Sequence, residues 1–346
     1  MKRIFVALAF IALLAIPVRA QELTAPPVPV HAEKFMPPDQ GNFAQGLLEV
    51  LRDALLHIRP DIKDAASICL SIAAVMMSVS LLRTFPDTPE KTINLAGSIG
   101  IALILLRTSN SLVNLAAATV TEISEYGKLL LPVMTAAMAG QGGVSQSAAL
   151  YAATALFDAL LTSIIGKILT PMIYLFLILS IVSSAIGEDM LKKMRDAMKS
   201  VMVWVLKNIL YIYTGYIGIS GVVSGTTDAA ALKAAKLTIS SVVPVVGGIL
   251  SDASEAILVS AGTVKNAAGI YGLFAVIALW IKPFLQIGVH YLLLKATGAV
   301  CSIFSTKETT DLIRDFSSAL GLLLAMTGAI CLMLLISLVC FLKGVG

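Results

Sequence analysis

Ionisable side chains inside apolar stretches are the residues of this sequence best placed to do chemistry. Asp158 lies in the apolar stretch 147–165, and His290 and Lys295 lie in another, 284–303. An ionised group in lipid is costly unless it is paired or hydrated, so such positions are candidates for an ion or solute pathway. A lysine can instead extend to the membrane surface, and a histidine can bond a neighbouring helix. Asp158 cannot reach as far, and for it a structural and a functional role both stay open.

Two apolar stretches contain glycine pairs at which the chain could turn inside a membrane. In the first, 129–139 would enter, turn at 140–143 and return as 147–165; the second covers 236–264. We expect re-entrant hairpins, because such broken backbone is tolerated only where protein or a wet cavity surrounds it. Asp252 either caps the second returning helix or lines a pore. The candidate pore or hairpin residues are Pro132, Gly142, Gly143, Asp158, Pro244, Gly247, Gly248 and Asp252.

No catalytic, cofactor or metal motif is present in the sequence. Its three histidines form no HExxH, and it has no phosphate-binding loop, no GxSxG and no zinc-ligand spacing. The four cysteines lie in apolar stretches without a CxxC pair, which is typical of small buried hydrophobic residues. We therefore expect a protein that is not an enzyme, with no catalytic residues, no cofactor and no metal.

The elements that must hold these residues are membrane helices. Hydrophobic residues make up 58% of the 346-residue chain and charged residues 13%, and the mean hydropathy is +0.90. A soluble chain of this length cannot bury that much apolar surface, so lipid must cover much of it. The net charge is +4, but the basic residues form no stripe interleaved with aromatic residues. This argues against nucleic-acid binding. The expected fold class is an all-α, polytopic helical membrane protein.

The first 64 residues are predicted to be exported. Lys2 and Arg3, the apolar run 4–16 and the small residue Ala20 are typical of a cleavable signal peptide over residues 1–20. Residues 21–64 then form a proline-rich linker and an amphipathic helix, with few Lys and Arg as expected of a translocated segment. The apolar face of this helix is predicted to contain Phe43, Leu47, Leu51, Leu55 and Ile58.

Residues 65–346 are predicted to form the membrane domain, with about seven spans plus the two re-entrant hairpins. The spans fall near 66–82, 93–118, 168–186, 201–223, 267–282, 284–303 and 319–342. The Lys- and Arg-rich segment 187–200 is assigned to the cytoplasmic side and to an interfacial helix. Its apolar face is expected to contain Met190, Leu191, Met194, Ala197 and Met198. The two hairpin regions share features that favour an internal repeat of 125–186 and 236–300.

One part of the sequence resembles a known family. The matching residues are Pro244-Val-Val-Gly-Gly248, Ser251-Asp252-Ala253, Val264-Lys265-Asn266 and Gly269-Ile-Tyr-Gly272, with Leu131-Pro132, Gly142-Gly143 and Ala234-Ala235-Lys236 as further matches. This pattern is similar to that of the stage III sporulation protein AE family. The likeness covers most of residues 45–342, and its most specific part is about 35 residues long.

The resemblance implies a function in endospore formation. It implies a component of the mother-cell membrane around the forespore, within a channel or secretion complex that late forespore gene expression requires. The implied partners are other stage III sporulation operon proteins and the forespore-side channel component, besides membrane lipid; self-association stays open. The family implies no catalytic residues. The alternative is a stand-alone secondary transporter or permease that uses the two hairpins.

Overall fold

The computed structural model describes residues 25–38, 43–85, 89–140, 144–219, 267–303 and 305–343. Within these ranges every regular element is a helix, so the all-α class is confirmed there. The predicted signal peptide, the second hairpin and its residues Pro244, Gly247, Gly248 and Asp252 lie outside the described residues.

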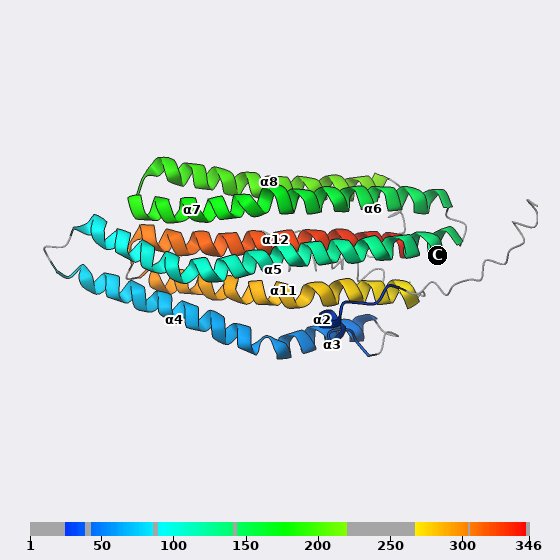
Figure 1. The fold of residues 1–346 in the computed structure, drawn as a ribbon, viewed down its shortest axis with the longest axis horizontal. Helices are drawn as coiled ribbons and strands as arrows, with labels where there is room; N and C mark the ends of the chain where they lie inside the picture. Colours follow the sequence, from blue (N-terminus) through cyan, green and yellow to red (C-terminus); the bar gives the residue numbers. More distant parts are fainter. Residues whose placement is uncertain are drawn as a thin grey trace, which may run out of the picture.

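Long helices lie side by side along one axis and form a bundle (Figure 1). They are α4 (Arg59–Leu82), α5 (Glu90–Gly140), α6 (Val144–Ile164) continued by α7 (Thr170–Ile186), α8 (Asp189–Ile219), α11 (Ala267–Cys301) and α12 (Lys307–Lys343). The connections α4–α5, α7–α8 and α11–α12 lie at one end, on the left of Figure 1. The short helices α2 (Val30–Glu33) and α3 (Phe43–His57) and the C-terminus lie toward the other end.

Helix α12 forms the centre of the bundle. It contacts α5, α6, α7, α8 and α11, and 94% of its most apolar window is buried within the protein. In α4 only 17% of the most apolar window is buried within the protein, as expected of a peripheral helix whose apolar side chains face outward. The expected span 319–342 lies within α12, and the expected span 66–82 lies within α4, so both of these helices are confirmed.

Helix α5 is longer than the sequence predicts. The expected span 93–118 and the first hairpin limb 129–139 are not separate segments, because residues 90–140 form one helix with Pro132 inside it. At 1.5 Å per residue this helix is about 76 Å long, against about 30 Å for a hydrocarbon core. A proline removes only one backbone hydrogen bond, and buried neighbours such as Leu130 and Leu131 keep the helix in place.

The second hairpin limb, 147–165, is likewise continuous with the expected span 168–186. The π-turn η1 (Ile165–Leu169) joins α6 to α7, and the N–H of Thr170 bonds the carbonyl of Ile165, five residues earlier. This register shift accommodates Pro171, which has no N–H to give to an ordinary helical bond. Helices α5 and α6 are in contact, but the turn residues Gly142 and Gly143 lie outside the described residues, and a re-entrant path stays a prediction.

The expected spans 267–282 and 284–303 are also a single helix, α11, with Pro283 in its interior. The division into two spans was wrong for the same reason, since burial against α12 and α4 outweighs one lost backbone bond. In the described part of the chain, five continuous helical stretches are long and apolar enough to cross a membrane: Arg59–Leu82, Thr92–Ala139, Gln146–Ile186, Gly269–Cys301 and Lys307–Leu342. Helix α8, which contains the start of the expected span 201–223, is not among them.

The predicted amphipathic helix is present as α3, and its predicted apolar face is only partly buried: Phe43 and Ile58 are buried and Leu47 packs against the core. Its buried residues are Phe43, Gly46, Val50 and Ala54, whereas Leu51 and Leu55 are exposed. Gly46 allows close contact with α11 because it has no side chain: an added Cβ would lie 2.5 Å from the ring of Phe274 on α11. The helix therefore packs Gly46 and Ala54 inward, and Leu51 and Leu55 point outward.

Candidate functional site

Asp158, which the sequence marks as a candidate for an ion or solute pathway, is buried between helices. It lies on α6 with 3% of its surface exposed, and its Oδ2 accepts a hydrogen bond of 2.6 Å from the hydroxyl of Ser124 on α5. Its Oδ1 has no hydrogen-bond partner among the described residues. The contact joins two antiparallel helices, which is the structural role that the sequence left open.

A second buried polar contact joins α8 to α12. The hydroxyl of Tyr213, which is fully buried, bonds the Ser337 hydroxyl and donates to the carbonyl of Met333 at 3.2 Å. The ring of Phe157, beside Asp158, packs edge-on against the Tyr213 ring with centroids 5.3 Å apart. Two polar contacts and one aromatic contact thus link α5, α6, α8 and α12.

The other predicted residues are dispersed. Pro132 lies on an exposed position of α5, eight residues beyond Ser124, and takes no part in the Asp158 contact. His290 is buried on α11, and its Nδ1 is 2.9 Å from the carbonyl of Gln286 in the same helix. Lys295 is exposed, as expected of a lysine that extends toward the surface.

The strongest charged contact was not predicted from the sequence. Nη1 of Arg195 on α8 lies 2.6 Å from Oδ2 of Asp315 on α12, and the two side chains are 10% and 12% exposed. Arg195 also contacts Asp196, its sequence neighbour, at 3.0 Å. Asp315 lies just before the apolar run 319–342, which was the available sequence signal. An acidic residue beside or within an apolar stretch is a candidate for a role in the protein, and this reasoning applies to Asp315 as it does to Asp158.

Segment 187–200 is helical, but from Asp189 onward it forms the first turns of α8 rather than a separate interfacial helix. Met190 and Met194 of the predicted apolar face are exposed, whereas Arg195 faces the bundle. The ion pair with Asp315 requires this rotation of the helix.

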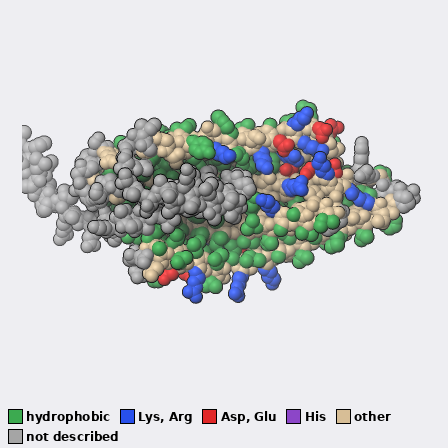
Figure 2. Space-filling view, turned by 180° about the vertical axis from the view of Figure 1, so that it is seen from behind, with side chains coloured by type: hydrophobic (Ala, Val, Ile, Leu, Met, Phe, Trp, Pro, Cys, Tyr) green, Lys and Arg blue, Asp and Glu red, His purple; other side chains and the backbone are tan. Residues whose placement is uncertain are grey.

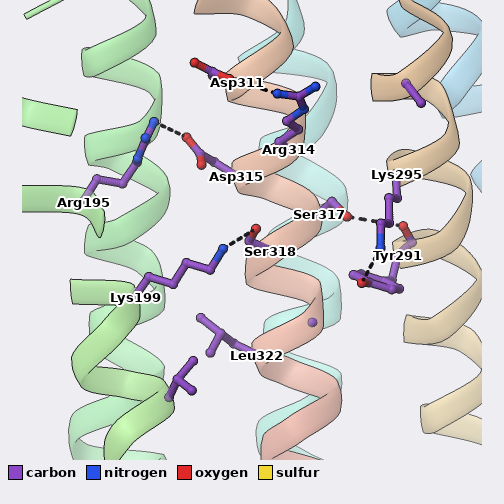
Figure 3. A pocket seen from close by; sticks show the side chains of 13 residues that line it. Arg195, Lys199, Tyr291, Lys295, Asp311, Arg314, Asp315, Ser317, Ser318 and Leu322 are labelled. Carbon is purple, nitrogen blue, oxygen red and sulfur yellow. Dashed lines mark hydrogen bonds and ion pairs between the residues drawn. The ribbon is translucent and has the colours of Figure 1, made fainter. Parts of the chain in front are cut away.

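A cavity of about 540 Å³ opens beside this ion pair (Figure 3). Its walls come from α8, α11 and α12, and its charged lining residues are Arg195, Lys199, Lys295, Arg314, Asp311 and Asp315. Lys199 donates to the hydroxyl of Ser318 at 2.9 Å, and Lys295 lies 5.5 Å from the centre of the Tyr291 ring. The reverse face of the molecule shows a cluster of basic and acidic side chains at one end and further basic side chains along one edge (Figure 2).

A further cavity of about 640 Å³ lies between α4, α5 and α11. Asp61 and Asp64 of α4, Arg107 of α5 and His290 of α11 contribute its ionisable groups. It therefore exposes groups of both charge signs within stretches that are apolar enough to cross a membrane. In the part of the chain that the structure describes, no three His, Cys, Asp or Glu residues are arranged to hold a metal ion.

A bundle of long helices, five of whose described stretches are long and apolar enough to cross a membrane, defines a helical membrane protein. The sequence match is more specific. The family model described as Stage III sporulation protein AE matches residues 36–344, and the chain belongs to this family. The resemblance read from the glycine- and proline-containing segments is thereby confirmed.

One relative is the Stage III sporulation protein AE of Bacillus subtilis (strain 168). It is 24% identical over 240 residues, which cover 69% of this chain and 60% of the relative. The aligned region thus spans less than two thirds of that protein. No solved structure matches the chain significantly.

Proposed function

We propose that this protein is a non-enzymatic membrane subunit of the channel or secretion complex that connects mother cell and forespore during sporulation, and that late forespore gene expression requires it. The observation that carries this proposal is the family match over residues 36–344, which includes almost the whole helical bundle. The buried polar groups support it, because Asp158, Tyr213, Arg195 and Asp315 each make a contact between helices. Such contacts between helices suit a protein whose polar interior holds its helices together.

The charge distribution supports a topology for this subunit. Basic residues of α8 and α12, such as Lys193, Lys199 and Arg314, lie at the end that holds the α7–α8 and α11–α12 connections. By the positive-inside rule we place this end in the mother-cell cytoplasm. Residues 25–57, toward the opposite end, would then face the space between the two membranes and the forespore-side channel component.

The exported segment is fixed to the bundle, which suits it for docking a partner. The hydroxyl of Tyr126 on α5 donates to the carbonyl of Pro26 at 3.2 Å, and the rings of Phe43 and Phe274 stack with centroids 5.1 Å apart. On α3 the outward leucines Leu48 and Leu55 are 66% and 57% exposed. A rigid exposed apolar face at this end is the kind of surface that a partner protein covers.

Crosslinking in sporulating cells tests the proposal. The tagged chain is captured after crosslinking, and the other stage III sporulation operon proteins are expected in the eluate at yields comparable to the bait. A tagged, unrelated membrane protein of similar size serves as the control. Recovery of the chain alone, or with the same background as the control, contradicts the complex-subunit proposal.

The alternative is a stand-alone secondary transporter, favoured by the cavity between α4, α5 and α11 with its Asp61, Arg107 and His290 lining. Purified protein in liposomes separates the two. A transporter moves a solute without other proteins and loses this flux in D61N or R107Q. A complex subunit moves none alone, and both variants still assemble with its partners.

A further inference from the structure

We infer that the cavity between α8, α11 and α12 binds the phosphodiester headgroup of an anionic membrane phospholipid. This cavity contains the side chains of Arg195, Lys199, Lys295 and Arg314 against only two carboxylates, those of Asp311 and Asp315. Four positive and two negative groups give a lining of net charge +2. An anion is the ligand that such a lining attracts.

The two carboxylates are already paired with the two arginines. Asp315 lies 2.6 Å from Arg195, and Asp311 lies 3.6 Å from Arg314. In the described ranges, no carboxylate lies within salt-bridge distance of Lys199 or Lys295. The excess positive charge of the cavity therefore resides on these two lysines.

The lysines are placed on opposite walls of the cavity and have hydroxyl groups beside them (Figure 3). Lys199 extends from α8 to Ser318 at 2.9 Å, and Lys295 on α11 is 3.4 Å from the Tyr291 hydroxyl. Ser317 also lines the space. Ammonium and hydroxyl groups on two sides of one opening match the several acceptor oxygens of a phosphate.

The position of the cavity identifies a lipid rather than a soluble anion as the source of this phosphate. On α8 and α12 the cavity lies where the charged first turns give way to the apolar runs that begin at Val201 and Ala319. That change of polarity marks the headgroup level of a bilayer. Val203, Ala299 and Leu322 supply an apolar wall along which an acyl chain can lie. Basic pockets of this kind between membrane helices bind anionic headgroups.

Native mass spectrometry of the detergent-purified full chain tests the inference with short-chain lipids. We expect phosphatidylglycerol to remain bound while phosphatidylcholine dissociates, and inorganic phosphate at the same concentration not to compete. Two lysines, each contributing about fivefold, predict roughly 25-fold weaker phosphatidylglycerol binding in K199Q/K295Q. The control K193Q/K307Q removes two charges from exposed positions at the same end and should bind as the wild type does.

Three results would overturn the inference. They are equal binding of phosphatidylglycerol and phosphatidylcholine by the wild type, undiminished phosphatidylglycerol binding by K199Q/K295Q, and displacement of the lipid by inorganic phosphate. The first and third need no variant, so a folding defect in K199Q/K295Q does not weaken the test. The complex-subunit proposal is independent, because partner capture in sporulating cells does not require this lipid site.

Discussion

Arg195 and Asp315 form a buried ion pair between α8 and the central helix α12, with 2.6 Å between Nη1 and Oδ2. The two residues are 120 positions apart in the chain. Both side chains are largely shielded, so removing one of them leaves the other charge poorly compensated. The pair fixes the rotation of α8 against α12 and forms one wall of the basic cavity.

Removing one member of this pair should therefore destabilise the protein strongly. We expect D315L to lower the free energy of unfolding by about 3 kcal/mol, because it leaves Arg195 buried with Asp196 alone. Denaturant titration in mixed micelles measures this change. R195M/D315L should recover most of the loss, since an apolar pair of similar volume has no charge to desolvate.

The matched control for D315L is D311N, on the same helix. Asp311 pairs with Arg314, whose side chain is 64% exposed, and such a pair contributes less than about 1 kcal/mol. An equal loss of stability in D311N and D315L would contradict the role given to the buried pair.

The hydrogen bond from Ser124 to Asp158 should stabilise the folded protein by holding α5 against α6. S124A removes the donor to Oδ2 and leaves a buried carboxyl group unsatisfied, so we expect a loss of about 1–3 kcal/mol in the same titration. T119A is the control on the same helix, because the Thr119 hydroxyl bonds only the carbonyl of Leu115 in its own helix. A smaller loss in S124A than in T119A would show that the contact is not structural.

Two glycines of the family-like segment are required for close packing of α11. A Cβ added to Gly269 would lie 2.1 Å from Cδ2 of Leu342 on α12, and one added to Gly272 would lie 2.8 Å from Cδ2 of Leu130 on α5. Such overpacking typically costs about 1–3 kcal/mol. We therefore expect G269A and G272A to lower the thermal midpoint of unfolding in detergent.

Gly288, further along α11, supplies the control, since an added Cβ meets nothing within 4 Å. G288A should be neutral or stabilising by up to about 1 kcal/mol because alanine favours the helix. Combining G269A with L342A should restore part of the midpoint by removing the clashing side chain. A larger loss in G288A than in G269A would contradict the packing argument.

The all-helical fold class and the positions of several individual helices could be predicted from the sequence. Apolar runs near 66–82 and 319–342 locate α4 and α12, because length and hydropathy alone identify such segments. The helical spacing between 43 and 58 likewise identifies α3. The contact of Gly46 with Phe274 was not predicted, because the spacing of large apolar residues does not show where a residue without a side chain allows close packing.

Helix continuity could not be predicted from local sequence. Pro132, Pro171 and Pro283 each remove a backbone donor, and local rules interpret them as ends or turns. Burial against α12 and the π-turn at Ile165–Leu169 compensate for these losses, and both depend on tertiary packing. The Arg195–Asp315 pair was missed for a related reason, since spacing along the chain contains no information on which helices become neighbours.

The placement of the two ends of the bundle on opposite sides of the membrane underlies both proposals, and cysteine labelling tests it directly. Single cysteines replace Glu49 on α3 and Lys193 on α8, both exposed positions, in a chain whose Cys69 is changed to alanine. The variants are expressed in non-sporulating cells, where the exported side of the membrane faces the medium, and a membrane-impermeant maleimide is applied to intact and then to permeabilised protoplasts. We predict that E49C reacts in intact protoplasts and K193C only after permeabilisation. Labelling of both positions from the same side would contradict the account.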